Sequence, residues 1–294
     1  MEDFKVIFVG KNPDASVLDF VLAYEKYCVS LAERILHHDA DIFCILDGKN
    51  RLTGVFSYSS GGQILHCLPT IFLAGQGDDE GGAQKLFSSL KNHFEKFNLK
   101  KLFSVIGEAK STDFVLKAIF SAVKKLPLSI TNFLLMEYLE DFQKKEIQKN
   151  DDENLQIFRC SPQMLQTLLP MQEAYEREEV LAAGQEYNEF LSSFMLKRAL
   201  RLQNVYVLAS GKVIVSKATF NAVSNSFAQL GGMYTAPRFR RNGYASRLVN
   251  FLVAQKKLEG KKVVLFVKNS NSIARSLYEN CGFTPFSGFK ICYY

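Results

Sequence analysis

Several features that would fix the class of this protein at once are missing from its sequence. No segment approaches the roughly 20 consecutive apolar residues of a membrane-spanning helix, and the N-terminus shows no basic leader followed by a small-residue cleavage site. The six cysteines include no Cys-x-x-Cys pair, which argues against disulfides and predicts a protein of the reducing cytoplasm. Of the four histidines only His37 and His38 are close together, so no metal site is expected.

Common nucleotide-binding and nucleic-acid-binding motifs are missing as well. The sequence has no Gly-x-x-x-x-Gly-Lys-Ser/Thr loop, and no Gly-x-Gly-x-x-Gly after a strand with an acidic residue downstream. It also has no recognised DNA- or RNA-binding motif. We therefore expect neither a nucleoside triphosphatase nor a dinucleotide-binding fold, and we expect no nucleic-acid partner and no membrane partner.

The composition is that of a globular protein with about two domains. The chain has 294 residues, of which 47% are hydrophobic and 22% charged. Residues 1–150 contain 18 basic and 19 acidic side chains, for a net charge of −1, and residues 151–294 contain 18 and 11, for +7. The second half is therefore the one that favours an anionic ligand, although surface lysines and arginines also serve solubility.

A polar stretch, Leu139–Asn154, divides the chain into two apolar-patterned halves. It predicts one domain at 1–140, a linker at 141–154 and a second domain at 155–294. In each half a glycine-containing loop precedes a helical pattern and then a strand, and both Gly82 to Gly243 and Lys100 to Lys261 are separated by 161 residues. This shared offset predicts an internal duplication, although such units are common enough for two offsets to match by chance.

Hydrophobic periodicity predicts the secondary structure around this repeat. In the first half it predicts strands at Asp41–Asp47, Leu52–Ser59, Gln63–Pro69 and Lys100–Ile106, and a helix after the loop Gly75–Gly82. In the second half it predicts helices at Ser161–Arg177 and Tyr187–Leu202, strands at Asn204–Ala209, Lys212–Phe220, Ser226–Thr235 and Val263–Val267, and two short final strands near Phe283–Phe286 and Lys290–Tyr293.

The hexapeptide Arg240–Ala245, of sequence RRNGYA, is the most informative segment. Residues 245, 248, 249 and 252 are apolar and follow the spacing of one helix face, so the hexapeptide leads into a helix N-terminus. Backbone amides there lack intrahelical partners, and the helix dipole is positive at this end. Gly243 and Ala245 allow a ligand to approach the backbone closely, and the two arginines add positive charge. The segment therefore predicts a diphosphate-binding site.

The pattern Arg-x-x-Gly-x-Ala in this hexapeptide resembles the pyrophosphate-binding signature of the GCN5-related N-acetyltransferase (GNAT) family, whose members use acetyl-CoA. The continuation supports the resemblance, because the apolar strand Val263–Val267 is followed by Asn271-x-x-Ala-x-x-Leu-Tyr278-Glu-x-x-Gly-Phe283. The matching stretch runs from about Gln229 to Phe283. It implies an α+β fold with a mixed sheet, here as two tandem GNAT-like acyl-CoA N-acyltransferase domains.

The resemblance also implies roles for individual residues. Acetyl-CoA would lie between two splayed strands, and backbone groups of Met233, Tyr234 and Thr235 would pair with its pantetheine arm. The pyrophosphate would be held by loop amides from Arg240, Arg241, Asn242, Gly243, Tyr244 and Ala245. Asn271 would bond the pantetheine or a water, cap the following helix, or do both.

Tyr278 would be the catalytic acid that protonates the departing CoA thiolate, since a phenol stays protonated at neutral pH. The alternative for Tyr278 is a packing role under the sheet. The base that deprotonates the amine is not visible: the family often has a glutamate on the strand before the arginine loop, and here that position is Gln229. Glu176, Glu178 and Glu179 are candidates, although each also fits a solvated helix end, and a chain of waters is a further option.

The first half lacks this chemistry. The offset of 161 residues places Asp79 opposite Arg240 and Lys117 opposite Tyr278, and the loop GQGDDEGG has three carboxylates where a diphosphate would lie. We therefore expect a degenerate, GNAT-like first domain without CoA. The whole chain is expected to be an acetyl-CoA-dependent N-acetyltransferase acting on a primary amine of unidentified structure. The alternative is a non-catalytic acyl-CoA-binding sensor or scaffold protein.

Overall fold

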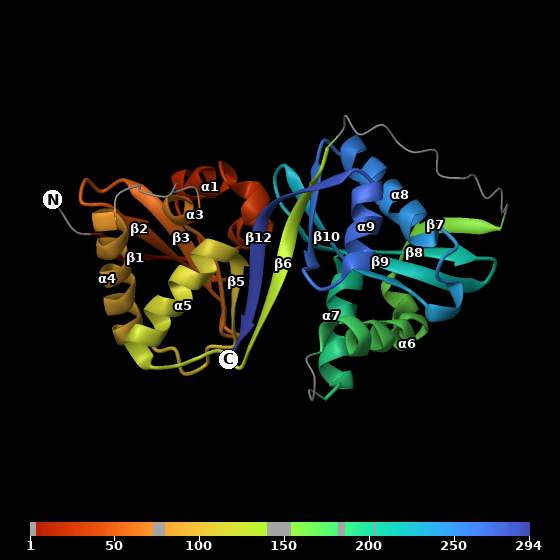
Figure 1. Ribbon diagram of the computed structural model, residues 1–294, viewed down its shortest axis with the longest axis horizontal. Helices are drawn as coiled ribbons and strands as arrows, with labels where there is room; N and C mark the ends of the chain where they lie inside the picture. The colour runs from red at the N-terminus through yellow and green to blue at the C-terminus, as the bar shows by residue number, and fades with distance from the viewer. Residues whose placement is uncertain (1–3, 73–79, 140–153, 182–185, 203) are drawn as a thin grey trace.

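The computed structural model describes residues 4–72, 80–139, 154–181, 186–202 and 204–294. Its two halves lie side by side and share one continuous sheet (Figure 1). The elements of the first half are β1 (Lys5–Gly10), α1 (Ala15–Leu22), α2 (Val29–His37), β2 (Asp41–Leu46), β3 (Leu52–Tyr58), β4 (Gln63–Cys67), α3 (Pro69–Phe72), α4 (Glu80–Lys96), β5 (Ser104–Glu108), α5 (Ala109–Val123) and β6 (Ser129–Tyr138).

Apart from α3, the second half repeats this order. Its elements are β7 (Leu155–Arg159), α6 (Leu165–Tyr175), a π-helical turn (Glu176–Val180), α7 (Glu189–Arg201), β8 (Val205–Ser210), β9 (Val213–Val223), β10 (Phe227–Thr235), α8 (Tyr244–Leu258), β11 (Lys262–Lys268), α9 (Ser272–Asn280) and β12 (Phe283–Tyr293). The common order of strands and helices in the two halves agrees with the internal duplication that the sequence predicts.

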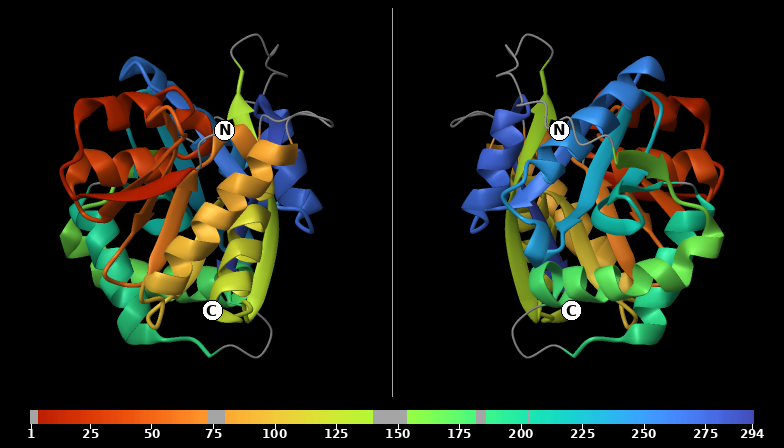
Figure 2. Two further views of the ribbon diagram at one scale, coloured as in Figure 1. Left: turned by 90° about the vertical axis from the view of Figure 1, so that its left-hand side faces the viewer. Right: turned by 90° about the vertical axis from the view of Figure 1, so that its right-hand side faces the viewer.

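Helices cover both faces of the sheet in each half (Figure 2). In the first half, alternate residues of β2 pack against α1 and α2 on one face and against α4 and α5 on the other. In the second half α6 and α7 cover one face, while α8 and α9 cover the other. A sheet buried on both faces needs apolar side chains at successive strand positions, which explains the continuous apolar runs in β2 and β11.

The final strand of each half is exchanged with the other half. Within the described residues the sheet order is β1-β2-β3-β4-β5-β12-β6-β11-β10-β9-β8-β7. Strand β12, from the end of the chain, pairs antiparallel with β5, and β6 pairs antiparallel with β11. The two exchanged strands also pair with each other from Phe283–Tyr138 to Tyr293–Ser129. Each half is therefore completed by a strand of the other.

The end of the chain differs from the two short strands predicted there. Residues Phe283–Tyr293 form a single strand whose register shifts between Pro285 and Ser287. The shift follows from proline, which has no backbone N–H to donate to a neighbouring strand. The predicted strand at Lys100–Ile106 also begins later, at Ser104, because the preceding residues form a turn in which Leu102 N donates to Leu99 O at 3.0 Å.

Helix α2 of the first half packs against β9 and β10 of the second. The buried carboxylate of Glu25, just before α2, accepts hydrogen bonds from the backbone N–H groups of Ser226 at 2.8 Å and Phe227 at 3.2 Å. Glu33 Oε1 accepts from Val223 N at 2.8 Å. A buried carboxylate is stable only when hydrogen-bonded, so these contacts fix the first half against the strands that bear the candidate site.

All six cysteines are free and buried. The residues that the structure describes contain no cluster of histidine, cysteine and carboxylate side chains able to hold a metal ion. In the same residues we find no helix with the length and apolar character needed to cross a membrane. The predicted linker 141–154 lies outside the described residues, except for Asn154.

Candidate active site

The site begins where two parallel strands separate. Strands β10 and β11 pair only from Phe227–Lys262 to Leu230–Leu265. Beyond Leu230, β10 keeps its pairing with β9 but has an irregular register at Gly231–Tyr234, while β11 continues beside β6. Gly232 has a φ of +56°, and a Cβ there would lie 2.9 Å from Thr219 Oγ1, so glycine is required at this bulge.

The separation opens a groove of about 150 Å³. One wall comes from the bulge of β10, the other from β11 and α9. Three of the residues predicted from the sequence line it together: Met233, Asn271 and Tyr278. Tyr175 and Glu179, from α6 and the π-helical turn, lie at its edge on the α6 side.

The predicted diphosphate site lies at the N-terminus of α8. Gly243 is the N-cap residue with a φ of +74°, and Arg241 has a φ of +67°. Asn242 Nδ2 donates to the carbonyls of Phe239 and Arg240, both at 3.1 Å, and so fixes the loop. A Cβ built on Gly243 would meet nothing within 4 Å, which leaves open space in front of the first amides of the helix. Tyr244 and Ala245 are its first two residues and are partly buried.

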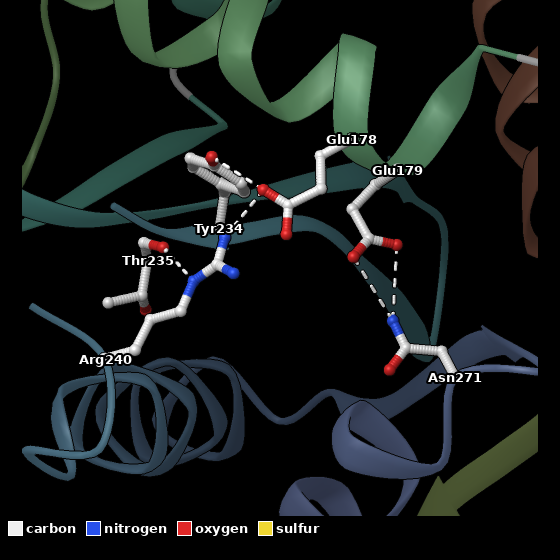
Figure 3. A network of polar contacts seen from close by, with 6 residues as sticks. All are labelled: Glu178, Glu179, Tyr234, Thr235, Arg240 and Asn271. Carbon is white, nitrogen blue, oxygen red and sulfur yellow. Dashed lines mark hydrogen bonds and ion pairs between the residues drawn. The ribbon is translucent and has the colours of Figure 1, made fainter. Parts of the chain in front are cut away.

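Arg240 is engaged within the protein rather than free (Figure 3). Its Nη2 lies 2.7 Å from Glu178 Oε2, and its Nε donates to Thr235 O at 3.0 Å. The hydroxyl of Tyr234 donates to the same Glu178 oxygen at 2.9 Å. The guanidinium beside Glu178, followed by the Tyr234 hydrogen bond, lowers the pKa of that carboxyl below its ordinary value. A phosphate at Arg240 would have to share the guanidinium with this carboxylate.

The neighbouring carboxylate reaches the opposite wall of the groove. Asn271 Nδ2 donates to Glu179 at 3.2 and 3.3 Å, and Asn271 Oδ1 accepts from Ala274 N at 2.9 Å as the N-cap of α9. Glu178 and Glu179 are successive residues of the π-helical turn, so the turn spans the mouth of the groove from β10 to α9 (Figure 3).

Tyr278 lies on α9 with 7% of its surface exposed, and its ring centroid is 5.9 Å from that of Phe283. Burial, together with the neighbouring Tyr175 hydroxyl, raises the pKa of Tyr278 above its ordinary value. The hydroxyl is therefore protonated at neutral pH, as a proton donor must be. The same ring also packs in the core, so both sequence interpretations of Tyr278 are compatible with its position.

A second, larger cavity of about 310 Å³ adjoins the groove and shares Tyr175, Asn221 and Gly232 with it. It lies between α6, α7 and β9, and Glu33 of α2 in the first half contributes to its wall. Of the three glutamates considered as bases, Glu176 accepts from Gln172 Nε2 at 2.6 Å and Ser192 Oγ at 2.8 Å. All three therefore have hydrogen-bond partners in the structure, and of the three only Glu178 is exposed.

Sequence reasoning missed Lys217, which lies on β9 and lines the larger cavity. Only 1% of its surface is exposed. Its Nζ donates to Gly232 O at 3.1 Å and lies 4.2 Å from the ring centroid of Tyr175. Burial lowers the pKa of Lys217 to about 7, although the Glu176 carboxylate opposes the shift. The available signal was a single lysine within the apolar strand VIVSKATF.

Gln229, at the position where the family often has a base, faces neither cavity. Its side chain is buried against Tyr27 and Cys28 of the first half, around a void of about 10 Å³. A carboxylate at this position would be buried between the two halves, with no access to the groove. The base must therefore come from elsewhere in this protein.

In the first half, the place that corresponds to the groove between β10 and β11 is filled by a side chain. Strands β4 and β5 pair in parallel from Gln63–Ser104 to Leu65–Ile106, and the next residues are His66 and Gly107. A Cβ on Gly107 would lie 2.4 Å from the ring of His66, and the remaining void is about 10 Å³. Burial lowers the pKa of His66 to about 4, so a neutral imidazole occupies the space. Asp78 and Asp79 of the acidic loop lie outside the described residues.

Comparison with known proteins agrees with this geometry. The sequence profile of the acetyltransferase (GNAT) family matches residues 165–283. A search of curated proteins found no match to this chain. Among solved structures, a GNAT-family acetyltransferase from Colwellia psychrerythraea superposes with a TM-score of 0.56 at 14% identity, covering 99% of each chain.

Two further structures match over the full length. A Drosophila protein gives a TM-score of 0.62 at 12% identity and covers 100% of this chain and 99% of its own. A tandem GNAT protein from the clavulanic acid biosynthesis pathway gives a TM-score of 0.56 at 11% identity, and it covers 99% of this chain and 98% of its own. At these identities the structural matches establish the fold, and the family of the second half rests on the sequence profile.

The order of strands in both halves, the splayed strands β10 and β11 and the match at residues 165–283 lead to one assignment. Residues 165–283 match the GNAT acetyltransferase family, whose cosubstrate is acetyl-CoA, and the N-terminal half has the same fold.

Proposed function

We propose that the protein is an N-acetyltransferase that transfers the acetyl group of acetyl-CoA to a primary amine. The observation that carries this proposal is the groove between β10 and β11, which shares Tyr175, Asn221 and Gly232 with a second cavity large enough for an acceptor. A cosubstrate and an acceptor must both reach one point for direct transfer. In this protein the two cavities adjoin at the bulge around Gly232.

The cosubstrate would lie along the path predicted from the sequence. The pyrophosphate would bind the amides of the loop Arg240–Ala245, in the open space before α8. The pantetheine would follow the unpaired edge of β10 at Met233–Thr235, as an added strand does. The thioester would then reach the bulge beside Tyr278, where the groove adjoins the acceptor cavity.

Transfer at this point needs an acid for the thiolate that leaves. The acceptor nitrogen attacks the thioester carbonyl carbon, the carbon–sulfur bond breaks, and Tyr278 donates its hydroxyl proton to the sulfur. The raised pKa of Tyr278 supports this role, because its hydroxyl is protonated when the thiolate forms. Asn271 would hold the start of α9 and, through Glu179, the turn above the groove.

The alternative is a non-catalytic acyl-CoA sensor or scaffold. It would need the groove but not the adjoining cavity, so the cavity of about 310 Å³ favours the enzyme. We also infer that residues 1–140 and 155–294 are two tandem domains joined by 141–154, with their final strands exchanged. Six free cysteines suit the reducing cytoplasm that we expect for the protein.

Two measurements test the proposed function. Calorimetry with acetyl-CoA should show one site per chain, because His66 fills the corresponding place in the first half. Free thiol release should then be followed with a panel of small amines, amino acids, aminoglycosides and peptides. Two binding sites would contradict the assignment of the first half. Tight acetyl-CoA binding without turnover of any amine would favour the sensor.

A further inference from the structure

The candidate carboxylate bases of this site are already committed to other contacts. Glu178 binds Arg240 and Tyr234, Glu179 binds Asn271, and Glu176 binds Gln172 and Ser192, as described above. An acceptor amine is an ammonium ion at neutral pH and must lose a proton before it can attack a thioester. A different group in the acceptor cavity is therefore needed to take this proton.

We propose that Lys217, in its neutral form, is the base that accepts the proton of the acceptor amine; this assignment rests on the proposed function. Lys217 lies opposite Tyr234 in the β9–β10 pairing and reaches the bulge, where its Nζ donates to Gly232 O at 3.1 Å. Gly232 borders both the groove and the acceptor cavity. The Nζ of Lys217 is thus placed beside the point where the thioester and the amine would meet.

The surroundings of Nζ favour the neutral amine. An ammonium group has three N–H donors, and within the described residues only Gly232 O accepts from it. The ring of Tyr175 offers a weaker cation–π contact at 4.2 Å. A buried charge with one hydrogen bond is unstable, so the ammonium readily gives up its proton. The resulting amine has a lone pair available to the cavity.

Several titratable or charged groups lie around Lys217: Glu33 of α2, Tyr175 of α6 and Arg198 of α7 line the same cavity, and Tyr234 of β10 lies opposite it. The two whose charges act on its pKa are Glu176 of the π-helical turn and Cys160 before α6. The Glu176 carboxylate raises the pKa of Lys217, but burial outweighs it and brings the pKa to about 7. A base with this pKa is substantially neutral at physiological pH and still binds a proton well.

The protons balance over the reaction. Neutral Lys217 takes one proton from the acceptor ammonium, and the free amine forms a carbon–nitrogen bond to the thioester carbonyl. The carbon–sulfur bond breaks, Tyr278 protonates the thiolate, and Tyr278 recovers a proton from the amide nitrogen of the product. Lys217 then releases its proton to solvent. The products are the acetamide, CoA as the free thiol and one proton.

The test compares Lys217→Met, Lys217→Arg and the control Lys212→Met, an exposed lysine at the β8–β9 turn. For an amine turned over by the wild type, kcat should rise with pH through about 7 and then level off. Lys217→Met should lower kcat by about 10²-fold or more and leave acetyl-CoA affinity within a few-fold. Lys217→Arg should be equally impaired, because arginine stays protonated.

Two outcomes would overturn the proposal. Turnover within a few-fold of wild type in Lys217→Met would show that Lys217 is not the base. In the second outcome, Lys217→Arg retains activity while Lys217→Met loses it through a raised KM. That result would identify Lys217 as an anchor for an anionic acceptor. Lys212→Met should behave as wild type throughout.

A measurement that does not depend on turnover separates this proposal from the proposed function. NMR of the full chain carrying isotope-labelled lysine, with Lys217→Met to assign the signal, gives the protonation state of Lys217 directly. A midpoint near 7 supports the proposal even if the acceptor panel fails. A midpoint near the ordinary lysine value, about 10.4, would overturn it even in an active enzyme.

Discussion

The carboxylate of Glu178 holds the guanidinium of Arg240, with Oε2 and Nη2 2.7 Å apart, at the entrance to the groove. Both side chains are about two-fifths exposed, at 41% each. The same carboxylate oxygen accepts the Tyr234 hydroxyl. Glu178 therefore pairs with the arginine that we propose for diphosphate binding, and a bound diphosphate would compete with it for the guanidinium.

This competition predicts that Glu178→Gln binds acetyl-CoA more tightly than wild type. An exposed ion pair contributes only about 0.2–1 kcal/mol, so the dissociation constant should fall by up to about fivefold. Calorimetry at low salt measures the effect, and it should shrink as salt screens the charges. Glu173→Gln, which breaks the exposed pair with Arg177, is the control. Unchanged or weaker binding in Glu178→Gln would mean that Glu178 helps to form the site.

Gly243→Asp should abolish acetyl-CoA binding without unfolding the protein. The new carboxylate would stand in the open space before α8 and repel a diphosphate there. Aspartate tolerates the left-handed backbone better than most residues, so the fold should survive.

The matched control for this prediction is Gly260→Asp, just beyond the other end of α8. Gly260 has a φ of +72° and open space around its Cβ position, as Gly243 does with +74°. Both variants should lose similar stability in thermal unfolding, but only the first should lose binding. If Gly243→Asp binds acetyl-CoA as wild type does, the diphosphate lies elsewhere.

Tyr278→Phe should lower kcat by about 10²-fold and leave acetyl-CoA affinity within a few-fold, because the hydroxyl acts as the thiolate leaves. Phenylalanine keeps the ring against Phe283, so the packing of α9 should persist. Tyr206→Phe, a buried tyrosine of the same core, controls for general effects of removing a hydroxyl. Unchanged turnover in Tyr278→Phe would leave Tyr278 with a packing role alone.

The sequence predicts the local elements of this fold better than their assembly. The strands at Asp41–Asp47 and Leu52–Ser59 and the helix after Gly243 were found within a few residues, since their periodicity reflects burial. The exchange of β6 and β12 was not predicted, and β6 itself was missed. Its partners β11 and β12 lie more than 100 residues away in the chain, and no local pattern records which edge of a sheet a strand joins.

In the candidate site, too, the sequence predicts the local features better than the contacts between distant residues. The loop Arg240–Ala245 and the position of Asn271 as an N-cap follow from local sequence. The contact of Arg240 with Glu178 joins residues 62 positions apart, and it depends on how the π-helical turn lies across the groove. Lys217 was missed because a lysine in a strand usually faces solvent, whereas α6 and α7 cover this face of β9.

The buried position of Lys217 predicts an unusual pH dependence of stability. Its pKa is about 7 in the folded protein and about 10.4 in an unfolded chain. Between these values the unfolded state binds more protons, so stability rises with pH. Below about pH 7 both states are protonated, and the destabilisation by the buried charge is complete. Lys217→Met removes the charge and should therefore raise the melting temperature.

The gain in melting temperature of Lys217→Met over wild type should be largest at pH 7 and below, and it should shrink steadily towards pH 10. Loss of the hydrogen bond to Gly232 O lowers the stability of the variant by an amount that does not depend on pH, so the slope of the difference reports the titration alone. Thermal unfolding of wild type, Lys217→Met and Lys212→Met across this range measures that slope. A difference between the Lys217 variant and wild type that stays constant with pH would show that Lys217 titrates as an ordinary lysine. The site would then lack a neutral amine at physiological pH, and another group would have to take the proton of the acceptor.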